Sequence, residues 1–320
     1  MSKNGLPRKP LTKRRLKNLI LNVLKNPFNM VVLVSLVILF CLIIIPLLTM
    51  IANTFTLAQG ELRRVQGHVG DFTLYYWKYI LAGTMSSAVL WGPLKNSFVC
   101  GFFTVLVSVP LGSVLAWLMI RTDIPGKKIL GLLVTVPYMI PSWTKALAWL
   151  AMFRNSTSGA DGFLAGMGIP IPDWLAYGPI AIVLCMSMHY YAFSYIMVSG
   201  ALRSINSELE EMGEIQGASK AQILRHITLP LILPSVLSAT VMTISKSIGT
   251  YGVPANLGNR IGYYTLATKM RNFIDQGPQA VGYAMSIVLV LLAALIIFSN
   301  QRIVGVRKSY ATVSGKGGRA

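Results

Sequence analysis

The chain has 320 residues, of which 54% are hydrophobic and only 12% charged, and its formal net charge is +19. So low a charged fraction excludes an ordinary soluble domain, in which about a quarter of the residues are charged. The positive charge lies at the chain ends and in short segments between apolar runs, and not in one basic patch, which argues against nucleic-acid binding. We therefore expect an integral membrane protein.

Six apolar runs approach the length of about 20 residues that a membrane helix needs. They predict an all-α fold, a polytopic membrane protein with about six transmembrane helices. Prolines interrupt the second and third runs, which a membrane helix tolerates where neighbouring helices satisfy the freed carbonyls. The first run is too long for a signal peptide and lacks a clear cleavage site. The runs cover residues 29–51, 94–120, 129–153, 178–200, 231–250 and 280–301.

Lys and Arg between the runs predict the orientation of the chain. Nineteen lie in the N-terminal segment, the loop after the second run, the segment 203–230 and the tail, against seven in the opposite loops. We therefore expect a basic cytoplasmic segment 1–28, a transmembrane domain 29–301 with a cytoplasmic loop 203–230, and a basic cytoplasmic tail 302–320. Both termini would then be cytoplasmic.

The external stretch between the first two runs ends in a group of aromatic residues, interpreted as a belt at the membrane surface because Trp and Tyr favour that boundary. These residues are Tyr75, Tyr76, Trp77 and Tyr79.

Residue types that carry catalysis or hold metals are scattered along the sequence. Its three Cys and three His form no C-x-x-C pattern or local cluster. The phosphate-binding spacing G-x-x-x-x-G-K-[ST] is absent from the sequence. We therefore expect a chain that is not an enzyme and that holds no metal and no cofactor. If ATP drives it, ATP and Mg must bind to another chain.

One polar loop carries a specific motif. The segment Glu211–Gly217, which reads EMGEIQG, is followed nine residues later by Ile227-Thr228-Leu229-Pro230. This resembles the signature loop of binding-protein-dependent ABC importer permeases of type I, which reads Glu-Ala-Ala, three residues, Gly, nine residues, and Ile-x-Leu-Pro. The two alanines are Met212 and Gly213 here. The resemblance implies that the loop docks into a separate ATPase subunit.

The residues themselves predict two short helices with a turn between them. Ser207 is a candidate N-cap, and acidic residues favour the first turn. Gly217 provides a break, Ala218–His226 restart as a helix, and Leu229-Pro230 end it. The expected ATPase-coupling residues are Glu208, Glu211, Gly213, Gly217, Ala218, Ile227, Leu229 and Pro230.

Three further segments extend the resemblance over about residues 94 to 300. Ala116–Lys128 is similar to the exit of the second helix in this family, and Pro137–Pro141 and Gly249–Gly258 are similar to its ferric-iron branch. Relatives in this branch also carry polyamines, thiamine and phosphonates. Ferric-iron permeases often fuse two halves in one chain, whereas this chain is a single half.

The resemblance implies the partners and the cargo class. We expect two ATP-binding subunits, a second permease subunit that is identical or homologous, an extracytoplasmic solute-binding protein, and membrane lipid around a bacterial inner-membrane complex. The cargo is chelated ferric iron, a phosphonate or another small charged solute, with polyamine, thiamine or sugar as alternatives.

Lysines inside apolar runs are costly and therefore informative. Lys145 and Lys246, with Ser245 and Tyr251 beside the latter, are candidates for the translocation path. The alternative is that both lysines snorkel to water near external helix ends or pair with Asp173 or Asp275. On the first interpretation, the positive charge favours an anion or a liganded metal over a bare cation.

An ion-coupled secondary transporter is the rival function. Such proteins use paired carboxylates within the membrane or discontinuous-helix repeats. No Asp or Glu falls within any of the six apolar runs, which disfavours this class.

Overall fold

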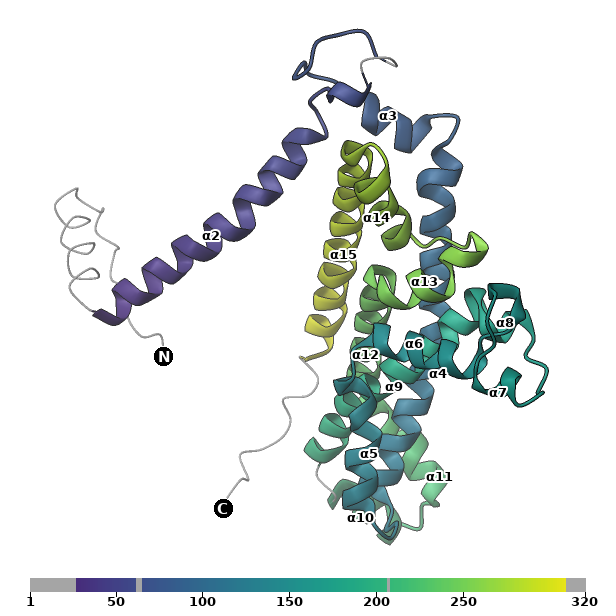
Figure 1. Cartoon of the computed structure of the whole chain (residues 1–320). Helices are drawn as coiled ribbons and strands as arrows, with labels where there is room; N and C mark the ends of the chain where they lie inside the picture. The colour runs from purple at the N-terminus through teal and green to yellow at the C-terminus, as the bar shows by residue number, and fades with distance from the viewer. Residues whose placement is uncertain (1–26, 62–64, 206–207, 309–320) are drawn as a thin grey trace, which may run out of the picture.

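The computed structural model describes residues 27–61, 65–205 and 208–308. Ser207 and most of the two basic terminal segments lie outside this part of the chain. Regular structure in the described residues is helical apart from an isolated bridge between Thr56 and Phe72. The prediction of an all-α polytopic fold is therefore confirmed (Figure 1).

Five helical segments are long and apolar enough to cross a membrane: Pro27–Asn53, Ser87–Arg121, Gly178–Ser204, Lys220–Gly249 and Gln279–Arg302. They correspond to the first, second, fourth, fifth and sixth predicted runs. The third run instead forms two shorter helices. The long elements are α2 (Pro27–Asn53), α4 (Gly92–Arg121), α9 (Gly178–Ser204), α12 (Leu229–Gly249) and α15 (Gln279–Lys308).

The third run breaks because of its second proline. Helix α5 (Lys127–Met139) ends before Ile140, whose ψ of 129° is extended, and α6 (Ser142–Phe153) begins after Pro141. A proline disfavours the helical region for the residue before it and has no N–H to donate into a preceding turn. The helices have 13 and 12 residues, so each alone is shorter than the bilayer.

Helices α4 and α9 form the centre of the bundle. Their backbones come close at Gly112, where an added Cβ would lie 2.4 Å from the carbonyl oxygen of Tyr191. Only glycine fits such a contact, and small residues at membrane helix interfaces allow this approach. One buried cluster joins α9 to α6 and α13 (Gly252–Leu257), and another joins α9 to α4 and α12.

The end of the bundle opposite α10 is built on α14 (Leu266–Gln276) and α15, against which α3 (Tyr75–Ala82) packs (Figure 1). Tyr76 is fully buried there, and its hydroxyl accepts a hydrogen bond of 3.0 Å from the backbone N–H of Ala58. Trp77 donates through Nε1 to Oγ1 of Thr54 at 3.2 Å. These aromatic residues therefore anchor α3 to its neighbours, and the expectation of a simple surface belt is wrong for Tyr76.

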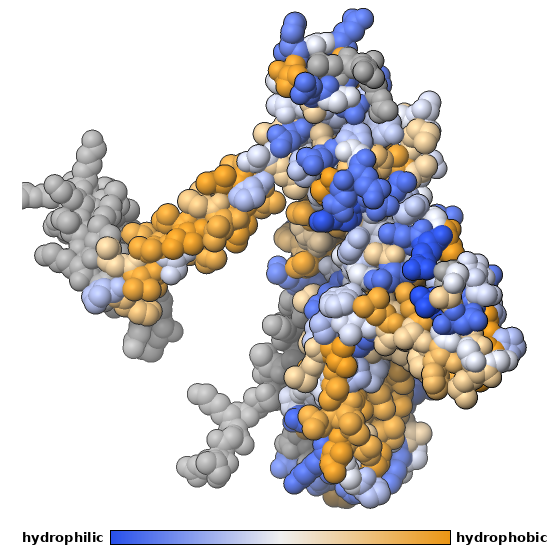
Figure 2. Space-filling model, viewed as in Figure 1, coloured by the Kyte–Doolittle hydropathy of each residue, from blue (hydrophilic) through white to orange (hydrophobic). Residues whose placement is uncertain are grey.

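The surface is apolar where a bilayer would surround it. Figure 2 shows apolar residues over α2 and over the lower bundle around α5, with polar residues at both ends of the molecule. Helix α2 buries none of its side chains and leans away from the bundle in Figure 1. The remaining described elements are short: η1 (Gln59–Glu61), η2 (Ser87–Trp91), η3 (Ser156–Ser158), α7 (Phe163–Gly166), α8 (Asp173–Ala176), α10 (Glu208–Ile215), α11 (Lys220–Ile223), η4 (Leu224–Thr228) and η5 (Asn259–Ile261).

Candidate functional site

The signature loop forms a compact element, which we call the coupling element and define as residues 208–230. Its first helix, α10, is followed by a turn at Gly217 with φ of +83°. The N–H of Gly217 bonds to the carbonyl of Glu214 at 2.9 Å, and that of Ala218 bonds to the carbonyl of Gly213 at 3.0 Å. These two bonds form a Schellman cap, which needs a left-handed residue at this place. The glycine of the motif is therefore the residue that ends α10.

The second helix begins two residues later than predicted. Ser219 is its N-cap: the Ser219 hydroxyl accepts from the backbone N–H of Gln222, and the Gln222 side chain accepts from the backbone N–H of Ser219 at 2.7 Å. This reciprocal pair is a capping box. Because a cap residue lies outside the helix it starts, Ala218 belongs to the turn and α11 begins at Lys220.

Gly213 and Ile227 lie on the inner side of the coupling element. A Cβ added to Gly213 would lie 3.2 Å from Cδ1 of Ile227 and 3.3 Å from Cγ1 of Ile223. The glycine that replaces an alanine of the family motif therefore lets α10 pack closely on two isoleucine side chains. This apolar contact closes the two short helices on each other.

Leu229 and Pro230 do not end the second helix, contrary to the sequence prediction. The chain runs from α11 through a π-helical turn, η4, directly into α12, and Pro230 lies in the first turn of α12. The N–H of Leu229 bonds five residues back to Leu224. A proline ring clashes with the carbonyl four residues before it and donates no bond there. The wider π turn accommodates both effects, so the helix continues without a break.

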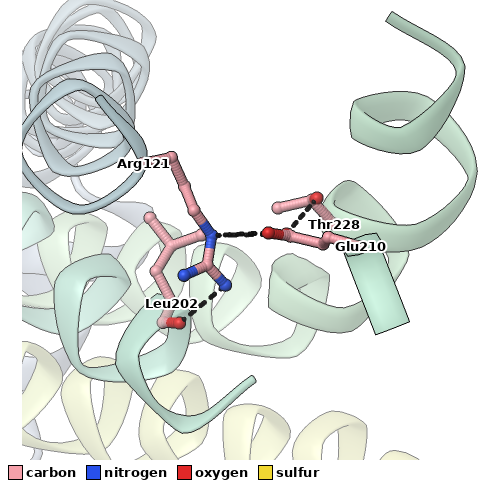
Figure 3. Close-up of polar contacts among 4 residues, drawn as sticks. All are labelled: Arg121, Leu202, Glu210 and Thr228. Carbon is pink, nitrogen blue, oxygen red and sulfur yellow. Dashed lines mark hydrogen bonds and ion pairs between the residues drawn. The ribbon is translucent and has the colours of Figure 1, made fainter. Parts of the chain in front are cut away.

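An ion pair that the sequence analysis missed ties the coupling element to the membrane helices (Figure 3). Arg121, at the end of α4, places Nε 2.9 Å from Oε2 of Glu210 and donates through a second nitrogen to the carbonyl of Leu202 at 3.1 Å. Thr228 donates its hydroxyl to Oε1 of Glu210 at 2.7 Å. Each side chain of the ion pair is only 18% exposed.

This contact, the Arg121–Glu210 clamp, joins α10, which contains Glu210, to three other elements. Arg121 is the last residue of α4, Leu202 belongs to the end of α9, and Thr228 lies in η4. Both residues of the ion pair lie next to or within motifs that the sequence analysis identified: Arg121 lies in the helix-exit motif, and Glu210 directly precedes the glutamate of the signature loop. Nothing in the sequence indicated that the two side chains, 89 positions apart, would meet.

The other expected coupling residues lie on the surface of the element. Glu208, Glu211, Leu229 and Pro230 are exposed, and so are Gly217 and the apolar neighbours Met212 and Ile215. Met212 is 56% exposed and Ile215 is 85% exposed. The element therefore presents acidic and apolar groups around a glycine turn.

Lys145, in α6, closes the break in the third predicted span. Its Nζ donates to the carbonyl oxygens of Pro137 and Ile140, the latter at 3.1 Å, and lies 2.5 Å from Nδ1 of His189. The carbonyls at the end of a helix lack partners within it, and a cation there also interacts favourably with the helix dipole. Lys145 therefore caps α5, with its three N–H donors directed at protein atoms.

Lys246, in α12, has a different environment. Its Nζ donates to the hydroxyl of Tyr138 at 3.0 Å and lies 4.8 Å from the ring centroid of Phe193. The Tyr138 ring stacks on His189 at 5.3 Å between centroids. The Lys246 side chain is exposed on the surface of the chain. Two of its three N–H donors have no hydrogen-bond acceptor among the described residues.

The aspartates named as alternative partners bind elsewhere. Asp173 accepts from Asn155 at 2.6 Å and from Thr157. Asp275 pairs with Arg271 at 2.7 Å. The alternative of pairing with these carboxylates is therefore wrong for both lysines. Ser245 is half-buried on α12, and Tyr251 precedes α13 and is 44% exposed.

Comparisons with known proteins support the family that the signature loop indicated. Residues 108–309 match the family described as binding-protein-dependent transport system inner membrane component. A protein of Marchantia polymorpha named for sulfate transport as a permease is 27% identical over 55% of this chain, and the match spans 59% of its length. A Salmonella typhimurium permease named for 2-aminoethylphosphonate transport is 28% identical over 72% of this chain and 80% of its own.

A solved structure has the same fold. It is a bacterial ABC transporter involved in the import of the acidic polysaccharide alginate, and it superimposes with a TM-score of 0.65 at 18% identity. The superposition covers 90% of this chain and 98% of that one. The family match spans more than half of the sequence and includes the whole coupling element. The chain therefore belongs to the binding-protein-dependent inner membrane components and is a permease subunit of a type I ABC importer.

Proposed function

We propose that this permease pairs with a second permease subunit, and that two separate ATP-binding subunits drive the pair by docking on the coupling elements. An extracytoplasmic binding protein delivers a small charged solute to the opposite side. ATP and Mg bind to the ATPase subunits, and this chain forms the path. The coupling element and both termini then lie in the cytoplasm, as the distribution of Lys and Arg supports.

The coupling element is the observation that carries this proposal. Exposed large apolar residues on a polar loop are characteristic of a surface that contacts another protein. Ile215 and Met212 are such residues, and both precede the left-handed turn at Gly217, where nothing fills the space around the glycine. A short apolar turn of this kind suits insertion into a groove on a partner subunit.

The connections of the element support the transmission of a push. On one side, the helix continues from α11 through η4 into α12. On the other side, the Arg121–Glu210 clamp joins α10 to the end of α4. A displacement of the turn by the ATPase would therefore move α4 and α12 together as a rigid body, which is the physical element that such coupling needs.

The charge of the chain supports an anionic cargo over a polyamine or thiamine cation. Lys145 and Lys246 lie in apolar segments, and the ion pairs in the described residues do not involve them. Two similar permeases are named for sulfate and for 2-aminoethylphosphonate, which both carry net negative charge. Like charges repel, so a bare cation would meet an electrostatic barrier beside these lysines.

Docking is tested by replacing Gly217 and following the ATPase. Gly217→Glu places a charge and a Cβ in the turn, and we expect the ATPase recovered with the tagged permease to fall by about tenfold or more, equivalent to about 1.4 kcal/mol of binding. Gly262→Glu is the matched control, because Gly262 has a similar φ of +71° and open surroundings. Equal recovery with both variants would refute the docking assignment.

The same preparation separates the importer from a secondary transporter. An importer accumulates solute in liposomes only with ATP and its ATPase, whereas an ion-coupled transporter needs an ion gradient and no second chain. Transport by the purified chain alone, without ATP, would overturn the proposed function.

A further inference from the structure

A second group of polar side chains, distinct from the coupling element, consists of Lys145, His189, Tyr138 and Lys246. We propose that Lys246, with the Tyr138 hydroxyl beside it, is the intramembrane station of a path for a small oxyanion that continues between α5 and α9 into a basic cytoplasmic cavity. This inference rests on the proposed function, because it names the class of solute that the importer carries.

The first argument is the depth of Lys246. A Cβ on Gly101 of α4 would lie 3.7 Å from Cβ of Ser247, the neighbour of Lys246. The continuous helical segment around Gly101 runs from Ser87 to Arg121. At about 1.5 Å per residue, Gly101 is roughly 21 Å from one end and roughly 30 Å from the other. Lys246 is therefore near the end of α12 but level with the interior of the Ser87–Arg121 helix. Figure 1 shows α12 ending at the level of α13, below α3 and α14.

The second argument is the lack of a counter-charge. Lys145 lies in the same group of side chains, through His189 and the ring of Tyr138 that stacks on it. Four carboxylates of the described residues form ion pairs, with Arg121, Lys127, Arg271 and His68, and neither Lys145 nor Lys246 is a partner in these pairs. Charges at such a depth are costly unless they face a partner or a water-filled cavity. A transient anion would provide the missing negative charge.

The third argument is the use of the donors. Lys145 directs its donors to two carbonyls and His189, so these donors are not available to a solute. Its positive charge can still attract an anion through space. Lys246 has an exposed side chain and donates one hydrogen bond, to Tyr138. Its remaining N–H groups, together with the phenolic O–H, are donors that suit the oxygens of sulfate, phosphate or a phosphonate.

The fourth argument is a cavity on the same face. It has a volume of about 710 Å³ between α4, α5 and α9, and its lining includes Thr135, Ile196, Lys128 and Arg203. Small-molecule sites have volumes of about 300–1,000 Å³. Residues three apart share one helix face. Thr135 is three residues before Tyr138 and Ile196 is three after Phe193, so the cavity and the Lys246 group lie along one face.

The charge of this cavity is uniform in sign. Its charged lining residues are Lys127, Lys128 and Arg203, and its lining contains no carboxylate among the described residues. Lys127 pairs with Asp123 at 3.4 Å, which leaves Lys128 and Arg203 as the unneutralised charges. A positively lined recess raises the local concentration of anions. An oxyanion that leaves Lys246 would therefore meet a second basic station on its way to the cytoplasm.

The test measures local anion preference and does not need the identity of the cargo. Met139 is 77% exposed and follows Tyr138, the residue whose hydroxyl Lys246 contacts, so Met139→Cys places an accessible thiol one residue from that contact. The variant is made in a chain whose Cys41, Cys100 and Cys185 are replaced by alanine. The chain is placed in neutral phosphatidylcholine bilayers. Its rates of modification by an anionic and a cationic methanethiosulfonate reagent are compared, each normalised to a free thiol.

We expect the anionic reagent to react faster by about tenfold, as one nearby positive charge predicts. Excess sodium sulfate should slow that reaction more than sodium chloride of equal ionic strength. Lys246→Met should abolish the preference, and Lys246→Gln, which keeps a donor toward Tyr138, covers the case in which the methionine variant does not fold. Lys269→Met is the matched control, because Lys269 also lies over an aromatic ring, that of Tyr264 at 4.7 Å, but in α14.

Three outcomes would overturn the inference. They are equal normalised rates for the two reagents, a preference that survives Lys246→Met and Lys246→Gln, and no modification by either reagent. If sodium chloride slowed the reaction as much as sodium sulfate, the preference would reflect general electrostatic attraction. That result would exclude a specific oxyanion site at Lys246. The measurement uses neither ATP nor an ATPase. Failure of the docking test would therefore refute the proposed function and leave these rates as an independent result.

Discussion

The coupling element and the break between α5 and α6 solve the same problem in different surroundings. In both places a helix ends and leaves backbone carbonyls without partners. The coupling element satisfies them locally, through the Schellman cap at Gly217, and starts its next helix with the capping box at Ser219. At the break, the carbonyls of Pro137 and Ile140 receive the ammonium of Lys145 from the following helix.

The difference follows from the solvent. Water can satisfy the remaining groups at the exposed coupling element, so short-range caps suffice there. A lipid bilayer has no water to offer, and each unsatisfied backbone group costs several kcal/mol. A charged side chain can therefore be stabilising at the α5–α6 break although it is costly elsewhere in a membrane. Lys145 therefore caps a helix end whereas Lys246 does not, although both lysines lie within predicted apolar runs.

The largest effect is expected from removal of the Lys145 cap. Lys145→Met leaves two carbonyls at the end of α5 without their donor, and we expect it to lower the free energy of unfolding by about 3 kcal/mol or more. Lys246→Met, the matched control, should change it by about 1 kcal/mol or less, since a cation–π contact and one hydrogen bond are lost. Titration with dodecyl sulfate in mixed micelles measures both. Equal destabilisation by the two variants would contradict the assignment of Lys145, but not Lys246, as the cap of α5.

An intermediate effect is expected from the Arg121–Glu210 clamp. Its side chains are largely buried, so removing one partner leaves the other without its charge-assisted bond at a cost of about 1–3 kcal/mol. A double-mutant cycle with Arg121→Leu and Glu210→Leu should give a coupling energy of about 1 kcal/mol or more, measured by ATPase-stimulated uptake and by hydrogen exchange in α10.

The exposed pair of Lys127 and Asp123 supplies the control for this cycle. Its side chains are 48% and 103% exposed, and such pairs contribute about 0.2–1 kcal/mol. A coupling energy in the clamp no larger than in this pair would show that the clamp does not hold α10 to α4.

The smallest effect is expected at Gly213. Gly213→Ala restores the residue of the family motif and gains about 1 kcal/mol of helix propensity, but its Cβ would crowd Ile223 and Ile227 at 3.3 and 3.2 Å. The side chains can shift by a few tenths of an ångström, so we expect a net change within about 0.5 kcal/mol. Gly213→Leu, which cannot fit, should open the contact between α10 and α11 and expose their amides to exchange. A neutral leucine variant would show that this contact is absent in solution.

Local features of the coupling element could be predicted from the sequence. The spacing of the motif indicated two short helices, a break at Gly217 and the family itself, which the comparisons confirm. The errors lie within a few residues: α11 starts after Ser219, and Leu229-Pro230 continue the helix. A single sequence does not reveal whether a proline ends a helix or sits in a widened π turn, because both depend on what packs around it.

Sequence alone determined the properties that depend on composition and on neighbouring residues: a membrane protein of apolar helices, the position of the coupling turn, and the two lysines as exceptional groups. Tertiary structure decided which atoms those groups meet. It placed Arg121 against Glu210, directed Lys145 to the end of α5, and left the Lys246 side chain exposed with one hydrogen bond to Tyr138. The physical reason is that helix caps and turns form between residues close in sequence. The contacts of Arg121, Lys145 and Lys246 instead join separate helices, whose relative positions are set by packing across the bundle.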